Sequence, residues 1–129
     1  MSKITAAITA VGGYVPDYVL SNKELETMVD TNDEWITDRT GIKERRILKD
    51  KDKGTSFLAI KAAKDLLKKN NTDPKDIDMV IMATATPDMP VAVTGAYVAT
   101  QIGADNAFSY DLMAACSSFL FGMSIAAKY

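Results

Sequence analysis

A continuous apolar run over residues 79–85 is the feature that most constrains the fold of this chain. A strand without polar alternation is covered on both faces, which is typical of a parallel sheet. Helical patterns flank the run: residues 55–67 carry an apolar stripe at helical spacing, and residues 94–102 form a helix-like run of small residues. A second strand is expected over residues 108–112. Strands that alternate with helices predict an α/β layered fold.

Several further elements are expected in the first third of the chain. Residues 4–15 are rich in Ala, Ile, Thr and Val, and we expect them to form a mostly buried strand that runs into a turn. Capping patterns that begin at Ser21 and Thr31 each predict the start of a helix. The second of these helices is expected to end at Gly41, and residues 43–48 are expected to be extended.

The C-terminal segment predicts an unusually apolar helix over residues 119–126. A helix that is apolar on most faces is expected to be buried in a larger body. No Gly, Asn or Pro closes the pattern before Tyr129. We therefore expect the chain to be a fragment, or half of a fold that is completed elsewhere.

Composition and charge exclude several classes of function. The 129 residues have a net charge of -2, so the chain has neither the basic footprint of a nucleic-acid-binding protein nor a polybasic membrane anchor. No apolar run is long enough to span a bilayer and no signal peptide is evident, so a cytoplasmic location is expected. The chain has no histidine, and chemistry that needs an imidazole base cannot be completed by these residues alone. No metal site is expected.

The single cysteine, Cys116, lies where a strand-like segment gives way to a helix. The dipole and the unpaired N–H groups of a helix N-terminus stabilise a thiolate. Small neighbours, among them Ala115 and Ser117, leave room for a substrate, and the backbone N–H of Cys116 could donate to an oxyanion. The ordinary alternative is that a free cysteine is a small buried hydrophobe, and position alone leaves that alternative open.

Three motifs resemble those of a known family. Residues 114–119, preceded by residues 110–112, resemble the nucleophile segment of beta-ketoacyl-acyl-carrier-protein synthase III. Residues 29–36, followed by residues 39–42, are similar to the coenzyme A-binding stretch of the same family, and residues 83–88 also match. The motifs occur in the family's order and cover essentially the whole chain.

The resemblance implies the fold. Members of this family have a five-layered αβαβα thiolase-like fold built from two similar halves, and they work as homodimers. All the matched segments belong to the first half. Residues 1–129 are therefore expected to be the N-terminal half of the fold, an incomplete thiolase-like condensing-enzyme domain truncated within the helix that follows Cys116.

The resemblance also implies a reaction. An acyl group, often acetyl, passes from acyl-CoA to the cysteine, and decarboxylative condensation with malonyl-acyl-carrier protein then gives a 3-oxoacyl-carrier protein that starts a fatty acid. Acyl-CoA is a substrate and no permanently bound cofactor is implied. The family's His and Asn partners would come from the second half of the fold. The isolated chain is therefore expected to be inactive.

Four residues receive roles from the resemblance. Cys116 matches the nucleophile, Trp35 matches the residue that stacks on the adenine of coenzyme A, Thr31 matches a residue that hydrogen-bonds the adenine, and Arg39 matches a phosphate-binding arginine. The structural alternatives are a core or interface anchor for Trp35, a helix cap for Thr31 and a solvated surface charge for Arg39.

Two further features bear on partners and specificity. The basic residues Lys43, Arg45 and Arg46 could dock an acidic carrier protein or form a solvated face. Val91 stands near the position at which many members carry Phe-Pro, so the identity of the acyl primer is open. A condensing enzyme of secondary metabolism and a non-catalytic coenzyme A-binding or assembly module are the alternative functions.

Overall fold

The computed structural model describes residues 6–129, which form two compact units. One unit comprises the segment that ends at Tyr14 together with Gly54–Tyr129, and the other is Val15–Lys53. Each unit is described by itself.

A parallel pair of strands forms the centre of the larger unit. Strands β3 (Met79–Ala83) and β4 (Phe108–Leu112) pair in register, with Met79 opposite Phe108 and Ala83 opposite Leu112. Helix α4 (Thr94–Ile102) connects them. The predicted strands, the crossover helix and the parallel pairing are confirmed.

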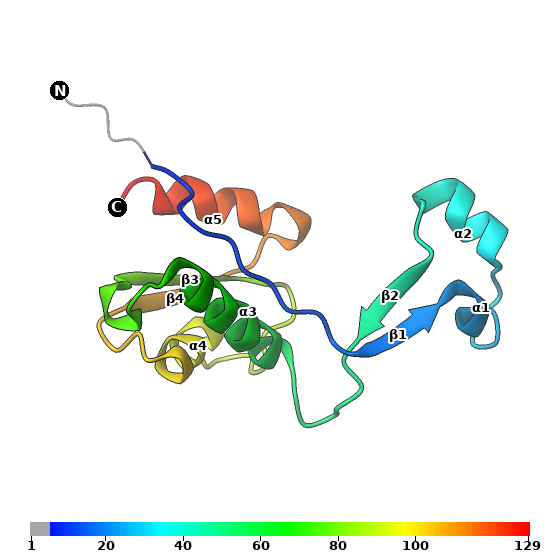
Figure 1. The fold of residues 1–129 in the computed structure, drawn as a ribbon, viewed down its shortest axis with the longest axis horizontal. Helices are drawn as coiled ribbons and strands as arrows, with labels where there is room; N and C mark the ends of the chain where they lie inside the picture. The colour runs from blue at the N-terminus through cyan, green and yellow to red at the C-terminus, as the bar shows by residue number, and fades with distance from the viewer. Residues whose placement is uncertain (1–5) are drawn as a thin grey trace. The chain divides into compact units, whose positions relative to one another are not determined.

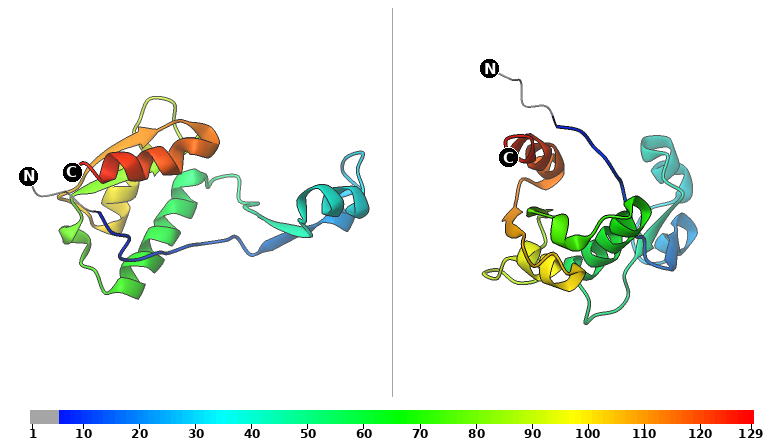
Figure 2. Two further views of the ribbon diagram at one scale, coloured as in Figure 1. Left: turned by 90° about the horizontal axis from the view of Figure 1, so that it is seen from above. Right: turned by 60° about the vertical axis from the view of Figure 1, so that its left-hand side comes forward.

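Helices cover this sheet on both faces, as Figures 1 and 2 show. Helix α4 packs on both strands and contacts α3 (Thr55–Asn70), whereas α5 (Ser118–Ala126) packs on β3 from the other face. Short 3₁₀ turns lie at Pro74–Asp76 and Ala115–Ser117. The buried side chains concentrate around α4, where Val98 and Ala99 are among the least exposed apolar residues.

The start of α4 is fixed to the sheet by one carboxylate. Asp111 of β4 accepts hydrogen bonds from the N–H groups of Thr94 and Gly95, each at 2.8 Å. These are two of the donors that a helix N-terminus leaves unpaired. A Cβ atom on Gly95 would lie 3.3 Å from the Asp111 carboxylate and from Met82 Cβ, so the glycine permits the close approach.

The predicted strand over residues 4–15 is wrong for the residues that the structure describes, and residues 4 and 5 lie outside them. The segment instead runs against α3. A Cβ atom on Gly12 would lie 2.5 Å from the backbone nitrogen of Leu66, and the N–H of Gly13 donates to Asp65 at 3.0 Å. Its backbone is therefore engaged by a helix, and no described strand pairs with it.

The smaller unit is an antiparallel strand pair with two helices. Strands β1 (Tyr18–Ser21) and β2 (Glu44–Ile47) pair antiparallel, and helices α1 (Asn22–Leu25) and α2 (Asp33–Thr40) lie between them in the chain. The Ser21 side chain accepts from Glu24 N–H at 3.1 Å, so the predicted cap of the first helix is confirmed. Leu20 and Ile36 are its buried apolar residues.

Helix α2 begins one residue later than the capping pattern predicts. Asn32, rather than Thr31, is the N-cap, and its side-chain oxygen accepts from Trp35 N–H at 2.8 Å. Both residue types cap helices, and asparagine is at least as effective as threonine. The predicted end is confirmed: Gly41 adopts the left-handed conformation with φ 71°. Among residues 6–129, no helix has both the length and the apolar character needed to cross a membrane.

Candidate active site

Cys116 follows the carboxyl end of β4. Because β3 and β4 are parallel, with Ala83 opposite Leu112, the segments that leave both strands start at the same edge of the sheet. Thr84 N–H donates to Leu112 C=O at 3.2 Å, and this bond links the segment after β3 to the end of β4. Ligands of open α/β sheets bind outside this edge.

The turn between β4 and α5 holds Cys116 in a constrained backbone. Ala115 has φ 46°, in the left-handed region that favours glycine, and such a conformation costs an alanine about 1–2 kcal/mol. Cys116 is the middle residue of the 3₁₀ turn Ala115–Ser117, immediately before α5. The predicted passage from strand to helix is therefore confirmed, but the strain at Ala115 had no signal in the sequence.

The Cys116 thiol is exposed. The structure therefore does not show the buried small hydrophobe that was the ordinary alternative for this residue. Alanines and serines surround it in the chain, so no large side chain of the turn itself blocks the sulfur. Within residues 6–129, no cluster of three or more His, Cys, Asp or Glu side chains could hold a metal ion.

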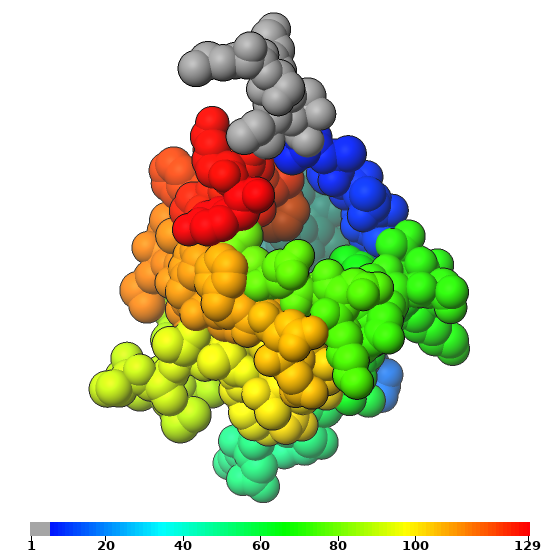
Figure 3. Space-filling view, turned by 90° about the vertical axis from the view of Figure 1, so that its left-hand side faces the viewer, coloured from blue at the N-terminus to red at the C-terminus, as the bar shows by residue number. Residues whose placement is uncertain are grey.

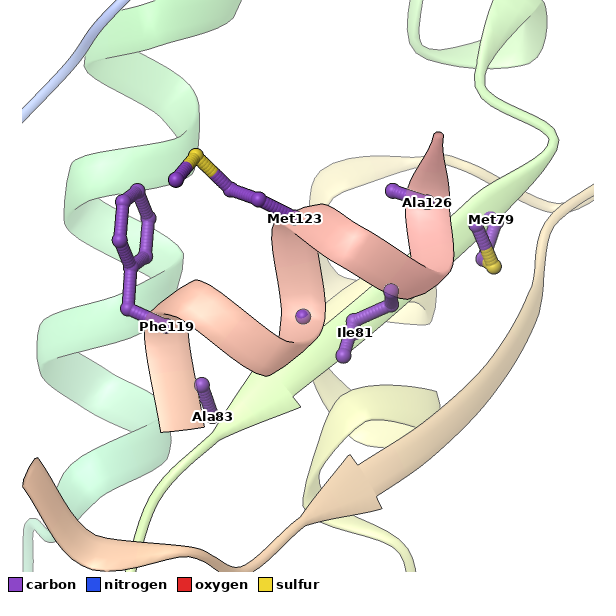
Figure 4. Close-up of a pocket in the computed structure, with 7 residues that line it drawn as sticks. Met79, Ile81, Ala83, Phe119, Met123 and Ala126 are labelled. Carbon is purple, nitrogen blue, oxygen red and sulfur yellow. The ribbon is translucent and has the colours of Figure 1, made fainter. Parts of the chain in front are cut away.

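An apolar groove lies between α5 and β3 in the same unit. Figure 4 shows its lining side chains, and Figure 3 shows the hollow beside α5. The groove has a volume of about 270 Å³ and is lined by Met79, Ile81, Ala83, Phe119, Gly122, Met123 and Ala126. None of these side chains carries a group for acid–base chemistry, so the groove contributes only apolar surface.

A second candidate site lies in the smaller unit, at the start of α2. Asp30, Thr31, Asn32 and Trp35 line a pocket of about 240 Å³. Trp35 is 53% exposed, so of its two structural alternatives, a core anchor and an interface anchor, the first is excluded. The cap role proposed for Thr31 is also excluded, because Asn32 takes it.

Arg39 lies one helical turn beyond Trp35. Its guanidinium carbon is 4.9 Å from the centre of the Trp35 ring, which is a cation–π contact. One face of the indole is therefore occupied by the arginine, and the guanidinium stays close to the pocket. The structure thus brings together the three residues of the predicted coenzyme A set, Thr31, Trp35 and Arg39, on one helix and its leading turn.

A buried asparagine that the sequence reasoning missed holds α2 in place. Asn22 is 1% exposed, and its amide nitrogen donates to Asp33 Oδ1 and to Ile42 C=O, each at 2.7 Å. Arg45 donates to Asn22 Oδ1 at 2.8 Å. Asn22 therefore links the first residue of α2 to strand β2. Its sequence position, immediately after a cap serine, gives no sign of this burial.

Replacing Asn22 with alanine is expected to lower the free energy of unfolding of the smaller unit by about 1–2 kcal/mol, because three hydrogen bonds are lost and buried partners are left unpaired. Urea unfolding followed by the fluorescence of Trp35, the only tryptophan of the chain, reports on this unit. The matched control is Lys23→Ala, which changes the exposed neighbour of Asn22 on α1 in the same unit and is expected to cost less than about 0.5 kcal/mol. Equal losses in the two variants would contradict the prediction.

Asp33 should make this unit sensitive to acid. The hydrogen bond from Asn22 lowers the pKa of the Asp33 carboxyl below its ordinary 3.8. Desolvation opposes this shift, and the charge of Lys43 assists it. Because the folded-state pKa is depressed, the stabilisation is fully present above the unfolded pKa and is lost as pH falls through the folded one. We expect the difference in urea midpoint between wild type and Asp33→Asn to be constant near neutrality and to shrink below about pH 4. A difference that does not change with pH would count against this.

Lys43 and the two arginines of β2, which follow it, have partners inside the unit. Arg45 also donates to Leu20 C=O at 3.3 Å, and Arg46 donates to the carbonyls of Pro16 and Asp17, each at 3.3 Å. Lys43 donates to Thr37 at 3.0 Å. These contacts support a structural role for the three cations, and docking of a carrier protein stays a prediction.

Comparison with known proteins shows which family this chain resembles. No protein-family model matches the chain. The beta-ketoacyl-acyl-carrier-protein synthase III of Phocaeicola vulgatus is 56% identical over 128 residues, which are 99% of this chain and 38% of that protein. The whole length of this chain matches synthase III. It spans about 38% of the length of the curated synthase III relatives that it matches.

Solved structures of synthase III and a related enzyme have the same fold. The Thermus thermophilus synthase III covers 95% of this chain with a TM-score of 0.88 at 43% identity, and the chain covers 38% of it. The priming beta-ketosynthase from the R1128 polyketide biosynthetic pathway covers 92% with a TM-score of 0.87 at 39% identity, and the chain covers 35% of it. The predicted class is confirmed: the chain has an α/β, thiolase-like fold that is only partly present in these residues.

Proposed function

We propose that this chain is part of a condensing enzyme in which Cys116 takes an acyl group from acyl-CoA and malonyl-acyl-carrier protein then receives it, which initiates fatty acid synthesis. The observation that carries the proposal is an exposed thiol in a constrained strand-to-helix turn, within a chain that matches synthase III over its whole length. A thiolate suits the role because it both attacks and leaves well.

The reaction has two balanced stages. In the first, the Cys116 sulfur attacks the acyl carbonyl carbon, the carbon–sulfur bond to coenzyme A breaks, and the thiol proton ends on the departing coenzyme A. In the second, the malonyl carboxylate leaves as carbon dioxide. The resulting enolate carbon attacks the thioester, and Cys116 leaves as a thiolate. The family's His and Asn would stabilise the enolate, and both lie outside this chain, which has no histidine.

The pocket at α2 supports acyl-CoA as the donor. Trp35 offers an aromatic face for the adenine ring, and Thr31, which does not cap α2, lines the same pocket. Arg39 supplies a guanidinium that suits phosphate. The enzyme would need no resident cofactor, because both substrates bring their own thioesters. By resemblance it would work as a homodimer in the cytoplasm.

The acyl primer is the least constrained part of the proposal. Val91 is 95% exposed in the loop that leaves β3, where many members carry a phenylalanine that closes the acyl pocket of the partner subunit. A smaller side chain would admit a longer or branched primer unless another residue fills the space. The likeness to the R1128 priming ketosynthase favours a related condensing enzyme of secondary metabolism as the second candidate.

A priming and condensation assay tests the proposal. The full-length protein that contains this chain would be incubated with acetyl-CoA or isobutyryl-CoA, and mass spectrometry would locate the acyl group on the Cys116 peptide. Added malonyl-carrier protein should then yield a 3-oxoacyl-carrier protein. Coenzyme A binding without acylation would favour a non-catalytic module. Preferential use of unusual primers would favour secondary metabolism.

A further inference from the structure

The turn that carries Cys116 is closed by two hydrogen bonds that both involve Ala114. The Ala114 carbonyl accepts from Ser117 N–H at 3.0 Å. The Ala114 N–H donates to Ser118 Oγ at 2.8 Å. Both bonds close a short loop that contains Cys116, so the position of its sulfur depends on them.

Ser118 is unusually well placed to hold this turn. Ser118 is 2% exposed and is the first residue of α5, which packs on β3. Its bond reaches back to the residue that follows Met113, just beyond the end of β4. The hydroxyl therefore connects α5 to the segment just after β4. The residues between them must fit the gap between the end of this strand and the start of this helix.

Ala115 shows that the gap imposes a conformation that the residue does not favour. Its φ of 46° lies in the left-handed region, yet it is not a glycine. Such conformations persist only when the surrounding structure over-determines them. The two hydrogen bonds of Ala114, which both span Ala115 and Cys116, supply that constraint.

We propose that Ser118 is a positioning residue, which acts by clamping Ala114 so that Ala115 stays left-handed and the Cys116 sulfur points at the incoming thioester. The inference rests on the proposed function, because it takes Cys116 to be the acyl-accepting nucleophile. Ser118 itself contacts no reacting atom. The rival explanation is that its hydroxyl only satisfies a buried amide and adds stability.

Coupling between positions 118 and 115 separates these explanations. Glycine adopts the left-handed region freely, so Ala115→Gly should make the clamp less necessary. Single-turnover acylation by acetyl-CoA would be measured in the full-length protein for wild type, Ser118→Ala, Ala115→Gly and the double variant. Ser118→Ala should lower the saturating acylation rate about tenfold with Ala115 present, the effect of one lost hydrogen bond. In the Ala115→Gly background the same change should cost less than about threefold.

Two further measurements support this cycle. The half-saturating acetyl-CoA concentration should be unchanged by Ser118→Ala, because the predicted adenine site lies in the other unit. Ser118→Thr, which keeps the hydroxyl, should recover most of the rate. If Ser118→Ala does not fold, Ser118→Gly, which leaves room for a water to bond the Ala114 amide, takes its place in the cycle with the same expected coupling. Hydrogen exchange in the wild type should also show the Ala114 amide protected, although it lies beyond the end of β4, because both explanations require the hydrogen bond to Ser118.

The failures are distinguishable. Wild-type protein that takes no acyl group from any acyl-CoA refutes the proposed function. The positioning role alone is refuted if the wild type is acylated and Ser118→Ala is acylated equally fast. It is also refuted if Ser118→Ala lowers the acylation rate by the same factor with Ala115 and with Gly at that position. An unprotected Ala114 amide would also refute it.

Discussion

Cys116→Ser is expected to lower acyl transfer from acyl-CoA by more than about 10³-fold, the largest effect of any single change in this chain. A serine hydroxyl is a far weaker acid than a thiol, so much less of it is ionised near neutrality, and its oxygen is also the weaker nucleophile. The oxygen would occupy the same exposed turn, with little change in shape. The loss would therefore report on chemistry rather than on folding.

The measurement is mass spectrometry of the full-length protein after incubation with acetyl-CoA. The wild type should carry an acetyl group on the Cys116 peptide, and the variant should carry none. Coenzyme A affinity and circular dichroism serve as controls, and neither should change. An acetyl group retained by the variant on another residue would overturn the assignment of Cys116.

The surroundings of Cys116 show how far sequence reasoning reaches. The strand-like segment over residues 108–112, the small residues of the turn and the apolar helix after it predicted the passage from β4 to α5. These are repeating patterns, which the sequence displays directly. The left-handed Ala115 and the hydrogen bond of Ser118 depend on how the strand and the helix are spaced in three dimensions, and no local residue pattern encodes that spacing.

The N-terminal segment shows where such patterns mislead. Ala, Ile, Thr and Val over residues 6–15 suit a strand, but a strand also needs a partner edge. In the structure, Gly12 and Gly13 bring the backbone against α3, and Ile8 and Val11 stay exposed. Composition therefore predicted a strand wrongly, because the tertiary context places the segment against a helix.

The start of α2 shows a smaller error with a functional consequence. Thr31 and Asn32 are both competent caps, so the sequence leaves the boundary uncertain by one residue. Capping by Asn32 leaves the Thr31 side chain in the pocket beside Trp35. The one-residue shift therefore favours the ligand role of Thr31 over its structural one. Residues at this pocket were predicted by family resemblance, whereas the buried Asn22 that supports them was not.

Trp35→Ala is expected to raise the half-saturating concentration of acyl-CoA about thirtyfold. Stacking of a base on an aromatic ring contributes about 1–3 kcal/mol, and the midpoint of that range corresponds to this factor. The acylation rate at saturating acyl-CoA should stay within about twofold, because adenine stacking is equal in the ground and transition states. Trp35 is half exposed, and Ile36 and Asn22 hold α2, so the fold should survive the change.

Trp35→Phe is the matched control, since it keeps an aromatic face on the same helix. It should raise the half-saturating concentration by less than about fivefold, because a smaller ring still stacks. Acylation by a short acyl thioester that lacks the nucleotide should be insensitive to both variants. If Trp35→Ala slowed that reaction as much as it slowed acylation by acyl-CoA, the indole would be supporting the fold of α2, and the adenine site would have to be sought elsewhere.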